Sequence, residues 1–460
     1  MNISELRAVF ALGSIFALRM LGLFMIVPVF AIYGQGYTEA TPALIGLAVG
    51  IYGLSQALLQ IPVSLLADRK ARKPIIIVGL LLFALGGAIA ALSTSIWGVI
   101  LGRAIAGSGA ISAVVMALLA DVTREEHRSK AMAAMGMSIG VSFIVAFSLG
   151  PILTKFLGLS GLFWLTSIAG ILAIGLLIVV PTPQRLIQQN PLGFKTQLQS
   201  VLALPDLNRL HLSIFMLHLI MTAAFVMLPQ MLIEYAHIPL THQGWLYLPL
   251  LVLGAAMTIP GVIIAELKRR MRRVFIVSVA LVLIAMLVLM FGQNRLGLII
   301  GIGLFFVAFN LLEALVPSWL AKGAPVAAKA TAMGINASSQ FLGAFAGGVL
   351  GGQLLGAGHV MLSWGILSAC ALIWLLIACG LKSPPYLSSL SVRIPDLPHH
   401  TAGRTSQLND WAGCLLEIEG IEDLVILAEQ HVVYLKVDKR KMNDATWLQL
   451  SDLVGHPVTP

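Results

Sequence analysis

Four ionisable residues lie inside long apolar stretches of the chain, where a charge is costly. They are Arg19, Arg103, His218 and Glu313. A charged side chain at the centre of a bilayer costs about 2.5–3.5 kcal/mol on insertion scales, so each of these residues needs a physical reason to be there. The carboxyl group of Glu313 and the imidazole of His218 could bind and release protons, whereas the two guanidinium groups stay charged and suit charge balance or an anionic ligand.

Each of these residues also has a purely structural interpretation. Arg103 could donate only to backbone carbonyls and hold helices together, His218 could be a packing residue, and Arg19 could neutralise Glu313 as a static ion pair. Amide side chains in similar stretches could line a cavity or join helices by hydrogen bonds. We take Asn310 as a further candidate for the cavity and for proton coupling. The candidates for substrate binding are Gln56, Asn336 and Gln340, and Gln60 is a similar polar group.

The composition indicates that these residues sit in a membrane protein. Of the 460 residues, 58% are hydrophobic and only 11% are charged, against about 25% charged in soluble domains. A spanning helix needs about 20 mostly apolar residues, and the sequence predicts twelve. The expected spans are 6–33, 42–66, 74–92, 97–120, 130–153, 161–180, 210–235, 243–266, 273–291, 296–320, 331–356 and 359–381.

The basic residues between the spans predict the orientation. Connections on one side of the membrane hold 18 Lys and Arg, and those on the other side hold only Lys155 and Arg295. The positive-inside rule therefore places both termini and the polar linker 181–209 in the cytoplasm of a bacterial cell, with the spans in its inner membrane. Because the cations are spread over short loops, the net charge of +9 indicates topology and argues against a nucleic-acid partner.

The membrane part is expected to consist of two related halves, 1–180 and 210–382. In the first half Pro62 precedes Asp68 by six residues and a basic loop follows. In the second half Pro260 precedes Glu266 by six residues and another basic loop follows. Duplicated six-helix halves are typical of transporters that bind their substrate between the halves, although two basic loops could also be similar by chance.

Two segments carry a resemblance to the major facilitator superfamily. Residues 64–73 are similar to the loop signature G-x-x-x-D-R-x-G-R-K, with Ser64 and Ala71 in place of two glycines. Residues 103–110 are similar to the fourth-span signature R-x-x-Q-G-x-G-A, with Ala106 in place of the glutamine.

The fifth span and the tail narrow this resemblance. The span ends Leu149-Gly150-Pro151, which resembles the signature of drug/proton antiporters, although Thr154 and Lys155 replace its second glycine pair. The tail is similar to that of superfamily members with a C-terminal YAM domain. The resemblance covers the whole chain. It implies an all-α membrane fold of twelve helices in two halves, followed by a small α+β domain.

The resemblance also implies roles for particular residues. The four ionisable residues fall on the first helix of each three-helix repeat, and in this family those helices line the central cavity. At the cytoplasmic surface, Asp68, Arg72 and Asp121 would form a conformational latch, in which Arg72 meets Asp121 and Asp68 meets a helix end of the second half. A solvated loop is the alternative interpretation of these three charges.

Residues 383–460 are expected to form a cytoplasmic linker and a ferredoxin-like α+β domain. The pattern predicts a helix at 408–418, strands at 387–394, 421–427 and 432–437, and a helix at 444–454 capped by Asn443. Cys414 stands alone, so metal delivery through a Cys-x-x-Cys loop is not expected. The domain could regulate transport or mediate self-association, or it could be a passive appendage.

Together these features predict a secondary active transporter that exports small amphipathic or drug-like compounds in exchange for protons. No cofactor, metal or ATP is expected, since no phosphate-binding loop of the G-x-x-x-x-G-K-[ST] type is present. The alternative is a transporter-like sensor that signals through its C-terminal domain. A membrane enzyme would need a clustered nucleophile and base or a metal set in the spans, and the sequence shows neither.

Overall fold

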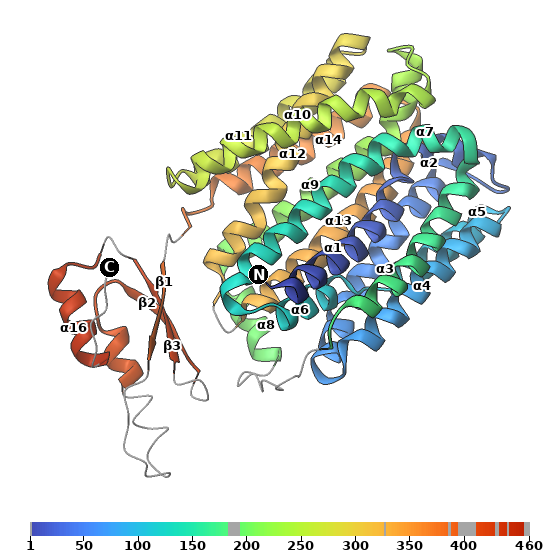
Figure 1. The fold of residues 1–460 in the computed structure, drawn as a ribbon. Helices are drawn as coiled ribbons and strands as arrows, with labels where there is room; N and C mark the ends of the chain where they lie inside the picture. Colours follow the sequence, from blue (N-terminus) through green and yellow to red (C-terminus); the bar gives the residue numbers. More distant parts are fainter. Residues whose placement is uncertain are drawn as a thin grey trace. The chain divides into compact units, whose positions relative to one another are not determined.

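The computed structural model describes residues 2–182, 194–325, 328–384, 388–393, 411–427, 432–438 and 441–454. These form two compact units. The first contains residues 1–189, 209–316 and 334–381, and the second contains 190–208, 317–333 and 382–460. Helices dominate the first unit and the three strands belong to the second (Figure 1).

The first half of the chain folds into helices whose breaks differ from the expected spans. The helices are α1 (Ile3–Phe24), α2 (Val27–Tyr33), α3 (Pro42–Arg69), α4 (Arg72–Leu92), α5 (Ile96–Ser108), α6 (Ser112–Val122) and α7 (Glu125–Val179). The expected spans 6–33 and 97–120 are each two helices. The first break precedes Pro28, which lies in the first turn of α2, where its missing N–H costs no hydrogen bond. The second break is at Gly109, which packs against the Gly79 carbonyl.

The two expected spans 130–153 and 161–180 lie within α7, as two helices that meet at a kink. The kink is at Gly158, whose φ of 66° is not helical, and it falls between the two expected spans. Because glycine adopts this conformation freely, Gly158 redirects the chain in a very short connection.

The second half contains α8 (Phe194–Leu202), α9 (Pro205–Glu234), α10 (Leu240–Glu266), α11 (Met271–Phe291), α12 (Arg295–Gly323), α13 (Lys329–Ala357) and α14 (Val360–Cys379). The predicted linker 181–209 therefore includes α8 and the start of α9. In Figure 1 the blue-to-green helices α1–α7 gather on one side of the bundle, and α10, α11, α12 and α14 gather on the other.

Ten stretches of the described residues are long and apolar enough to cross a membrane. One of them, Lys130–Val179, contains two of the twelve expected spans, and α13 covers another expected span without being among the ten. The count of twelve crossings therefore remains a prediction.

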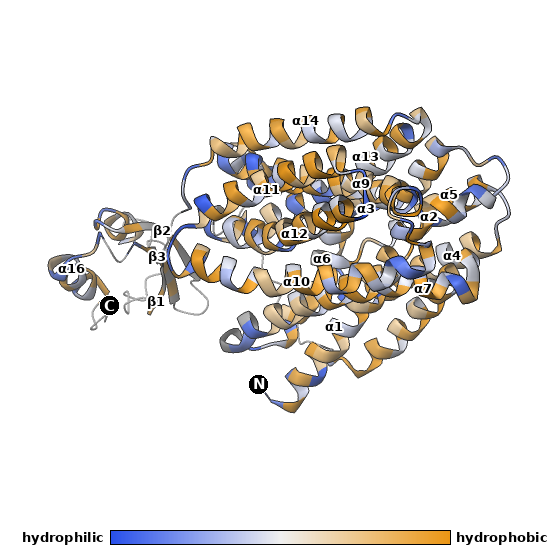
Figure 2. Ribbon diagram, turned by 90° about the horizontal axis from the view of Figure 1, so that it is seen from above, coloured by the Kyte–Doolittle hydropathy of each residue, from blue (hydrophilic) through white to orange (hydrophobic). Residues whose placement is uncertain are grey.

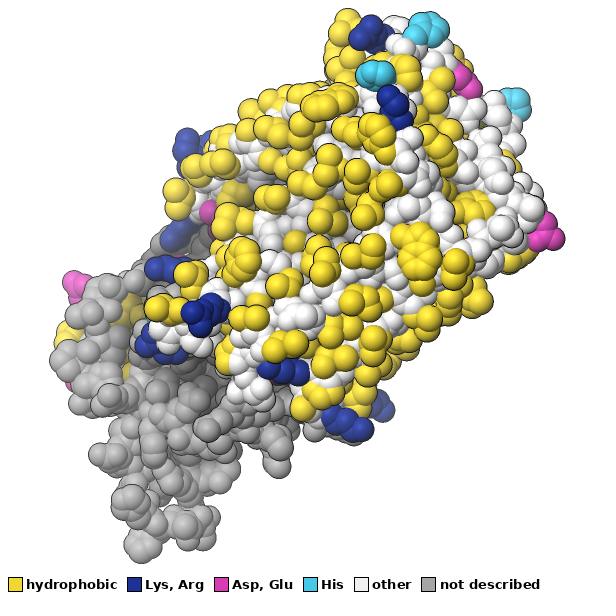
Figure 3. Space-filling view, turned by 45° about the vertical axis from the view of Figure 1, so that its right-hand side comes forward, with side chains coloured by type: hydrophobic (Ala, Val, Ile, Leu, Met, Phe, Trp, Pro, Cys, Tyr) yellow, Lys and Arg dark blue, Asp and Glu magenta, His cyan; other side chains and the backbone are white. Residues whose placement is uncertain are grey.

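Large apolar side chains such as Leu81, Ile171 and Leu376 point outward, as expected where lipid is the solvent. Figure 2 shows hydrophobic residues along all these helices. In Figure 3 hydrophobic side chains cover the middle of the visible face, with Lys and Arg at its edges.

Close contact between the two halves is built on glycines of α3 and α13. A Cβ atom added to Gly46 would lie 2.2 Å from the Gly348 carbonyl oxygen, and one added to Gly50 would lie 2.7 Å from the Phe345 carbonyl oxygen. The contact continues to Gly53, which lies against Phe341. Closer to the start of α13, a Cβ atom on Gly334 would meet nothing within 4 Å. Small residues thus let the two backbones touch over one part of the helix pair only.

A second contact between the halves joins α7 and α10. A Cβ atom added to Gly244 would lie 2.0 Å from the Ser148 carbonyl oxygen. Gly244 lies near the start of α10, just as Gly46 lies near the start of α3. Both contacts therefore lie near the first residues of a helix, that is, near the start of α3 and the start of α10.

The tail folds around a three-stranded antiparallel sheet. Its strands are β1 (Ser388–Arg393), β2 (Ile421–Leu427) and β3 (Val432–Val437), in the order β1-β3-β2. Residues 411–416 are helical, and α16 (Asp444–Val454) begins where Asn443 accepts a hydrogen bond from the Thr446 N–H at 2.9 Å. The buried side chains of Leu415, Leu435 and Trp447 belong to one apolar core. β2, β3 and α16 cover the residues that the sequence predicts for them.

Candidate functional site

Three polar side chains meet in the second half of the bundle. His218 projects from α9, Glu313 from α12 and Gln340 from α13. His218 Nε2 lies 3.2 Å from Glu313 Oε1 and 2.9 Å from Gln340 Nε2. The His218 side chain is 3% exposed, whereas the Glu313 side chain is 31% exposed. The cluster therefore combines a buried imidazole with a glutamate side chain that is partly exposed.

The hydrogen bonds of this cluster restrict where its protons can be. His218 Nδ1 lies 3.1 Å from the Ile214 carbonyl oxygen. A carbonyl only accepts, so Nδ1 carries a proton. Gln340 Nε2 can only donate, so its 2.9 Å contact makes His218 Nε2 the acceptor and leaves the imidazole neutral. Glu313 Oε1 lies 3.2 Å from Nε2 without a hydrogen bond to it. A proton on Glu313 would remove the repulsion between a carboxylate and the lone pair of Nε2.

An aromatic bridge connects this cluster to the first half. The ring of His218 lies 5.7 Å from that of Phe309 in an edge arrangement, and Phe309 stacks on Phe143 of α7 at 5.2 Å. Phe147 of α7 contacts Phe225 of α9 at 4.8 Å. Aromatic pairs at these distances have preferred geometries. A change at His218 can therefore alter the contact between the halves.

A separate polar cluster lies in the first half. Arg19 of α1 donates to Ser112 Oγ of α6 at 2.9 Å and to Gln56 Oε1 of α3. Gln56 Nε2 donates to Ser112 Oγ at 3.1 Å and to Gln60 Oε1 at 3.3 Å. Among the described residues, Arg19 forms no ion pair. The static pair with Glu313 that the sequence left open is therefore not formed in this structure, where Glu313 meets His218 instead.

Arg103 of α5 binds α3 about two turns before Gln56. It donates through Nη2 to the Val49 carbonyl at 3.1 Å and through Nε to the Ala48 carbonyl. Its guanidinium carbon lies 6.0 Å from the centre of the Tyr52 ring. These contacts match the structural interpretation, in which Arg103 holds α5 against α3.

The remaining amide candidates are not brought together. Asn310 Nδ2 donates to the Phe306 carbonyl of its own helix at 2.8 Å and lies against Gly254 of α10. Asn336 is 5% exposed, and its Oδ1 atom has no hydrogen-bond partner. Of the three predicted substrate-binding amides, Gln340 joins the His218 cluster and Gln56 joins the Arg19 cluster.

The three predicted latch residues are only partly described. Arg72 Nη1 lies 3.2 Å from Asp121 Oδ2, and their side chains are 12% and 25% exposed. The side chain of Asp68 lies outside the described residues. The arrangement holds the start of α4 to the end of α6, and whether it acts as a latch is taken up as a proposal below.

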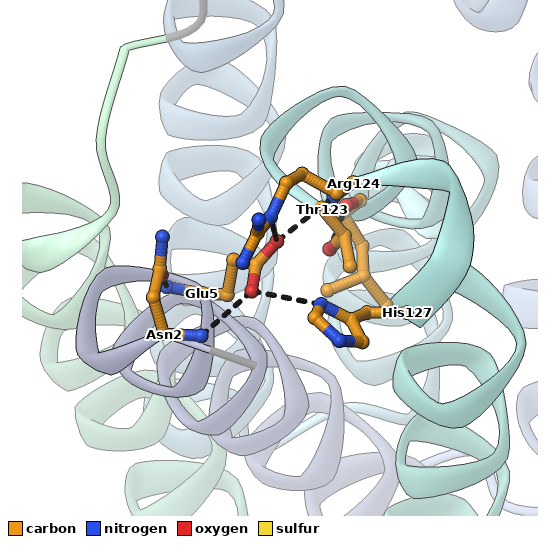
Figure 4. A network of polar contacts seen from close by, with 6 residues as sticks. Asn2, Glu5, Thr123, Arg124 and His127 are labelled. Carbon is orange, nitrogen blue, oxygen red and sulfur yellow. Dashed lines mark hydrogen bonds and ion pairs between the residues drawn. The ribbon is translucent and has the colours of Figure 1, made fainter.

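Sequence reasoning missed a carboxylate network at the start of α1. Glu5 accepts hydrogen bonds from the Asn2 N–H at 2.8 Å and from the Arg124 N–H and Nε at 3.0 and 3.1 Å. His127 Nδ1 lies 3.1 Å from its other oxygen. Figure 4 shows the carboxylate between the α1 terminus and the Thr123–His127 turn. Asn2 followed three residues later by Glu5 is a capping-box pattern, and it was the available signal.

Replacement of Glu5 by Gln is expected to lower the melting temperature of the purified protein. The amide keeps the size of the side chain but replaces one acceptor oxygen by a donor, so N–H groups of Arg124 or Asn2 lose their partner. The matched control is Glu234→Gln, because Glu234 contacts only Gln230 in the described part of the chain. A scanning-fluorimetry melt in detergent compares them. Equal melting temperatures for both variants would show that the network contributes nothing to stability.

The comparisons with known proteins agree with this fold. The family profile described as Major Facilitator Superfamily matches residues 12–348. The "Inner membrane transport protein YajR" of Escherichia coli (strain K12) is 45% identical over 449 residues, which are 96% of each chain. A class H tetracycline resistance protein of Pasteurella multocida is 34% identical over 109 residues, covering 24% of this chain and 27% of that protein. The solved structure of a D-xylose-proton symporter matches with a TM-score of 0.67 at 14% identity, covering 83% of this chain and 98% of that one.

Proposed function

The chain belongs to the Major Facilitator Superfamily, and from that premise we propose that it exports small amphipathic or drug-like compounds in exchange for protons. It is a membrane transporter and not an enzyme. The observation that carries the proton-coupled part of the proposal is the contact between His218 and Glu313. Here a carboxyl group lies against an imidazole, and the imidazole is next to an aromatic contact between the halves.

Loss of a proton from Glu313 supplies the driving step. A protonated Glu313 can remain 3.2 Å from His218 Nε2, which accepts from Gln340. When the proton leaves to water, the lone pair on Nε2 faces a carboxylate, and the two groups repel. Glu313 can then turn toward the open space beside its side chain, while Gln340 keeps its contact with Nε2. A movement of the His218 ring would displace Phe309, and Phe309 would in turn displace Phe143 of the other half.

Alternating access follows from the way the halves meet. The glycine contacts of α3 with α13 and of α7 with α10 close one end of the bundle, and the space beside Gly334 supports opening at the other. By the positive-inside rule the closed end faces away from the cytoplasm. We therefore assign this structure to a state open to the cytoplasm of the bacterial inner membrane, with both termini on that side.

The class of compound is supported by sequence similarity. Over about a quarter of its length the chain resembles proteins described as tetracycline resistance proteins. The apolar and aromatic residues between the halves suit a cargo with an apolar body. Tetracycline is therefore the first compound to test, within a panel of amphipathic compounds.

The Arg72–Asp121 pair would serve as part of the latch. Arg72→Asp and Asp121→Arg are each expected to reduce export several-fold, because each single change places like charges together at 3.2 Å. The double variant restores the attraction with the charges exchanged and is expected to recover part of the flux. Flux into inverted vesicles measures this. A double variant as inactive as the worse single variant would contradict a role for the ion pair itself.

The alternative function is that of a sensor, and the observation that supports it is the separately folded tail. The tail has its own core and could signal or self-associate as a ferredoxin-like YAM domain. Proton-dependent uptake of a compound panel by liposomes containing the purified full-length chain separates the two functions. An exporter moves compounds in exchange for protons that flow the other way, whereas a pure sensor moves no compound.

A further inference from the structure

We propose that the cluster of Arg19, Gln56, Gln60 and Ser112 binds the anionic oxygens of the transported compound, so that the cargo is a carboxylate or similar oxyanion on an apolar body. This inference rests on the proposed transport function and adds a substrate class to it. The cluster lies in the first half of the bundle, whereas the His218–Glu313 pair lies in the second.

The first argument is an uncompensated buried charge. Arg19 is 3% exposed, and the oxygens that accept from it belong to Ser112 and Gln56, which are neutral. Among the described residues, no carboxylate lies within ion-pair distance of Arg19 or of Arg103, the other buried guanidinium of this half. Charges inside a membrane protein are usually paired, and an unpaired one marks a site of function.

The second argument is an excess of hydrogen-bond donors. Within this cluster, the buried atoms that lack a partner are Arg19 Nε and Gln60 Nε2, and both are nitrogens. The acceptor atoms of Gln56, Gln60 and Ser112 are already used by neighbours. What the cluster lacks is therefore an acceptor. A water molecule could accept from these groups, but it would leave the charge of Arg19 unbalanced.

The third argument is a small, mostly apolar cavity one helical turn from the cluster. Its lining includes Leu23, Tyr52 and Phe83, together with the polar residues Arg103 and Thr166. Leu23 follows Arg19 by one turn of α1, and Tyr52 precedes Gln56 by one turn of α3. In the present state the cavity has room for about one water molecule, so an apolar body beside the cluster requires these helices to move apart. Phe341 of α13 packs against Tyr52 in the present state, so the ligand enters or leaves when α3 and α13 separate.

Binding of matched ligands to the purified full-length protein tests the proposal. Naphthoate and benzoate carry a carboxylate, and naphthamide and benzamide are their neutral counterparts of similar shape. Thermal stabilisation is measured over a concentration series at constant ionic strength. We expect saturable stabilisation by at least one carboxylate at concentrations about 10- to 100-fold below its amide, the range of a charge-assisted hydrogen bond. Equal responses to acid and amide, or no response to any of the four, would overturn the proposal.

Variants then locate the effect. Arg19→Gln and Gln60→Leu are expected to remove the preference for the carboxylate, and Arg19→Lys to keep part of it. If Arg19→Gln does not fold, the ligand preferences of Gln60→Leu and Arg19→Lys still show whether the carboxylate binds at this cluster. Arg295→Gln removes an exposed guanidinium and should leave the preference unchanged. A preference that survives both Arg19→Gln and Gln60→Leu would place the anion elsewhere and overturn the assignment.

The same assay separates this inference from the proposed function. Glu313→Gln is expected to lose proton coupling while keeping the preference for the carboxylate, because the two clusters lie in different halves. If Glu313→Gln transports normally and the preference is present, the proton proposal fails and the anion proposal stands. If coupling is lost in Glu313→Gln and wild type shows no preference, the reverse holds.

Discussion

Glu313→Gln is expected to reduce proton-driven flux to the level of liposomes without protein. The amide keeps the size of the side chain and can still lie beside His218, but it cannot release a proton. The repulsion from His218 that follows deprotonation is then lost, and the proton gradient no longer acts on the contact between Phe309 and Phe143. The measurement is uptake of labelled compound by inverted proteoliposomes with an imposed pH gradient.

Two controls make this result specific. Glu234→Gln changes an exposed carboxyl group whose contact is with Gln230, and it should retain the flux of wild type. Exchange of labelled for unlabelled compound without a pH gradient reports binding and alternation without net proton movement, and it should survive in Glu313→Gln. Undiminished proton-driven flux in Glu313→Gln would sink the role assigned to this residue.

The second large effect is expected from Gly46→Leu. A Cβ atom at Gly46 already comes within 2.2 Å of the Gly348 carbonyl oxygen and 2.6 Å of the Gly352 Cα atom, both backbone atoms that cannot turn away. A leucine must push α3 and α13 apart, so the closed end can no longer close. We expect a loss of most transport together with a lasting separation of the two helix ends.

The separation can be measured directly with spin labels. In a background without native cysteines, labels at Ala40 and Ala357 report the distance between the start of α3 and the end of α13. Gly46→Leu should shift this distance distribution to longer values. Gly175→Leu is the matched control, because a Cβ atom on Gly175 meets nothing within 4 Å. An unchanged distribution in Gly46→Leu would show that the halves do not rely on this contact to close.

The sequence predicts the apolar helices well, because a helix that spans a bilayer needs a long run of apolar residues. The sequence also predicts the interruption between the two spans of α7, where the kink at Gly158 lies. It does not predict the breaks near Met25 and at Gly109. Neither of these two breaks changes the local hydropathy enough to be seen in the sequence.

For the candidate site, residue type predicts which side chains matter but not which of them meet. The cost of burying charge singles out Arg19, His218 and Glu313 correctly as residues in polar clusters. Pairing depends on the rotation of each helix and on which helices are neighbours. The sequence therefore left open an Arg19–Glu313 pair, whereas Glu313 meets His218. Ser112 was missed because a serine in a membrane helix is common and carries no charge.

The most direct test of proton-coupled export follows protons and compound together in one preparation. Wild-type protein is placed in liposomes that contain a pH-sensitive dye, without a membrane potential, and labelled tetracycline or another panel compound is added on one side. Each compound that moves down its gradient should drive protons in the opposite direction, and an imposed proton gradient should concentrate it. Movement of a compound with no accompanying change in internal pH, and no dependence on the imposed gradient, would contradict the account.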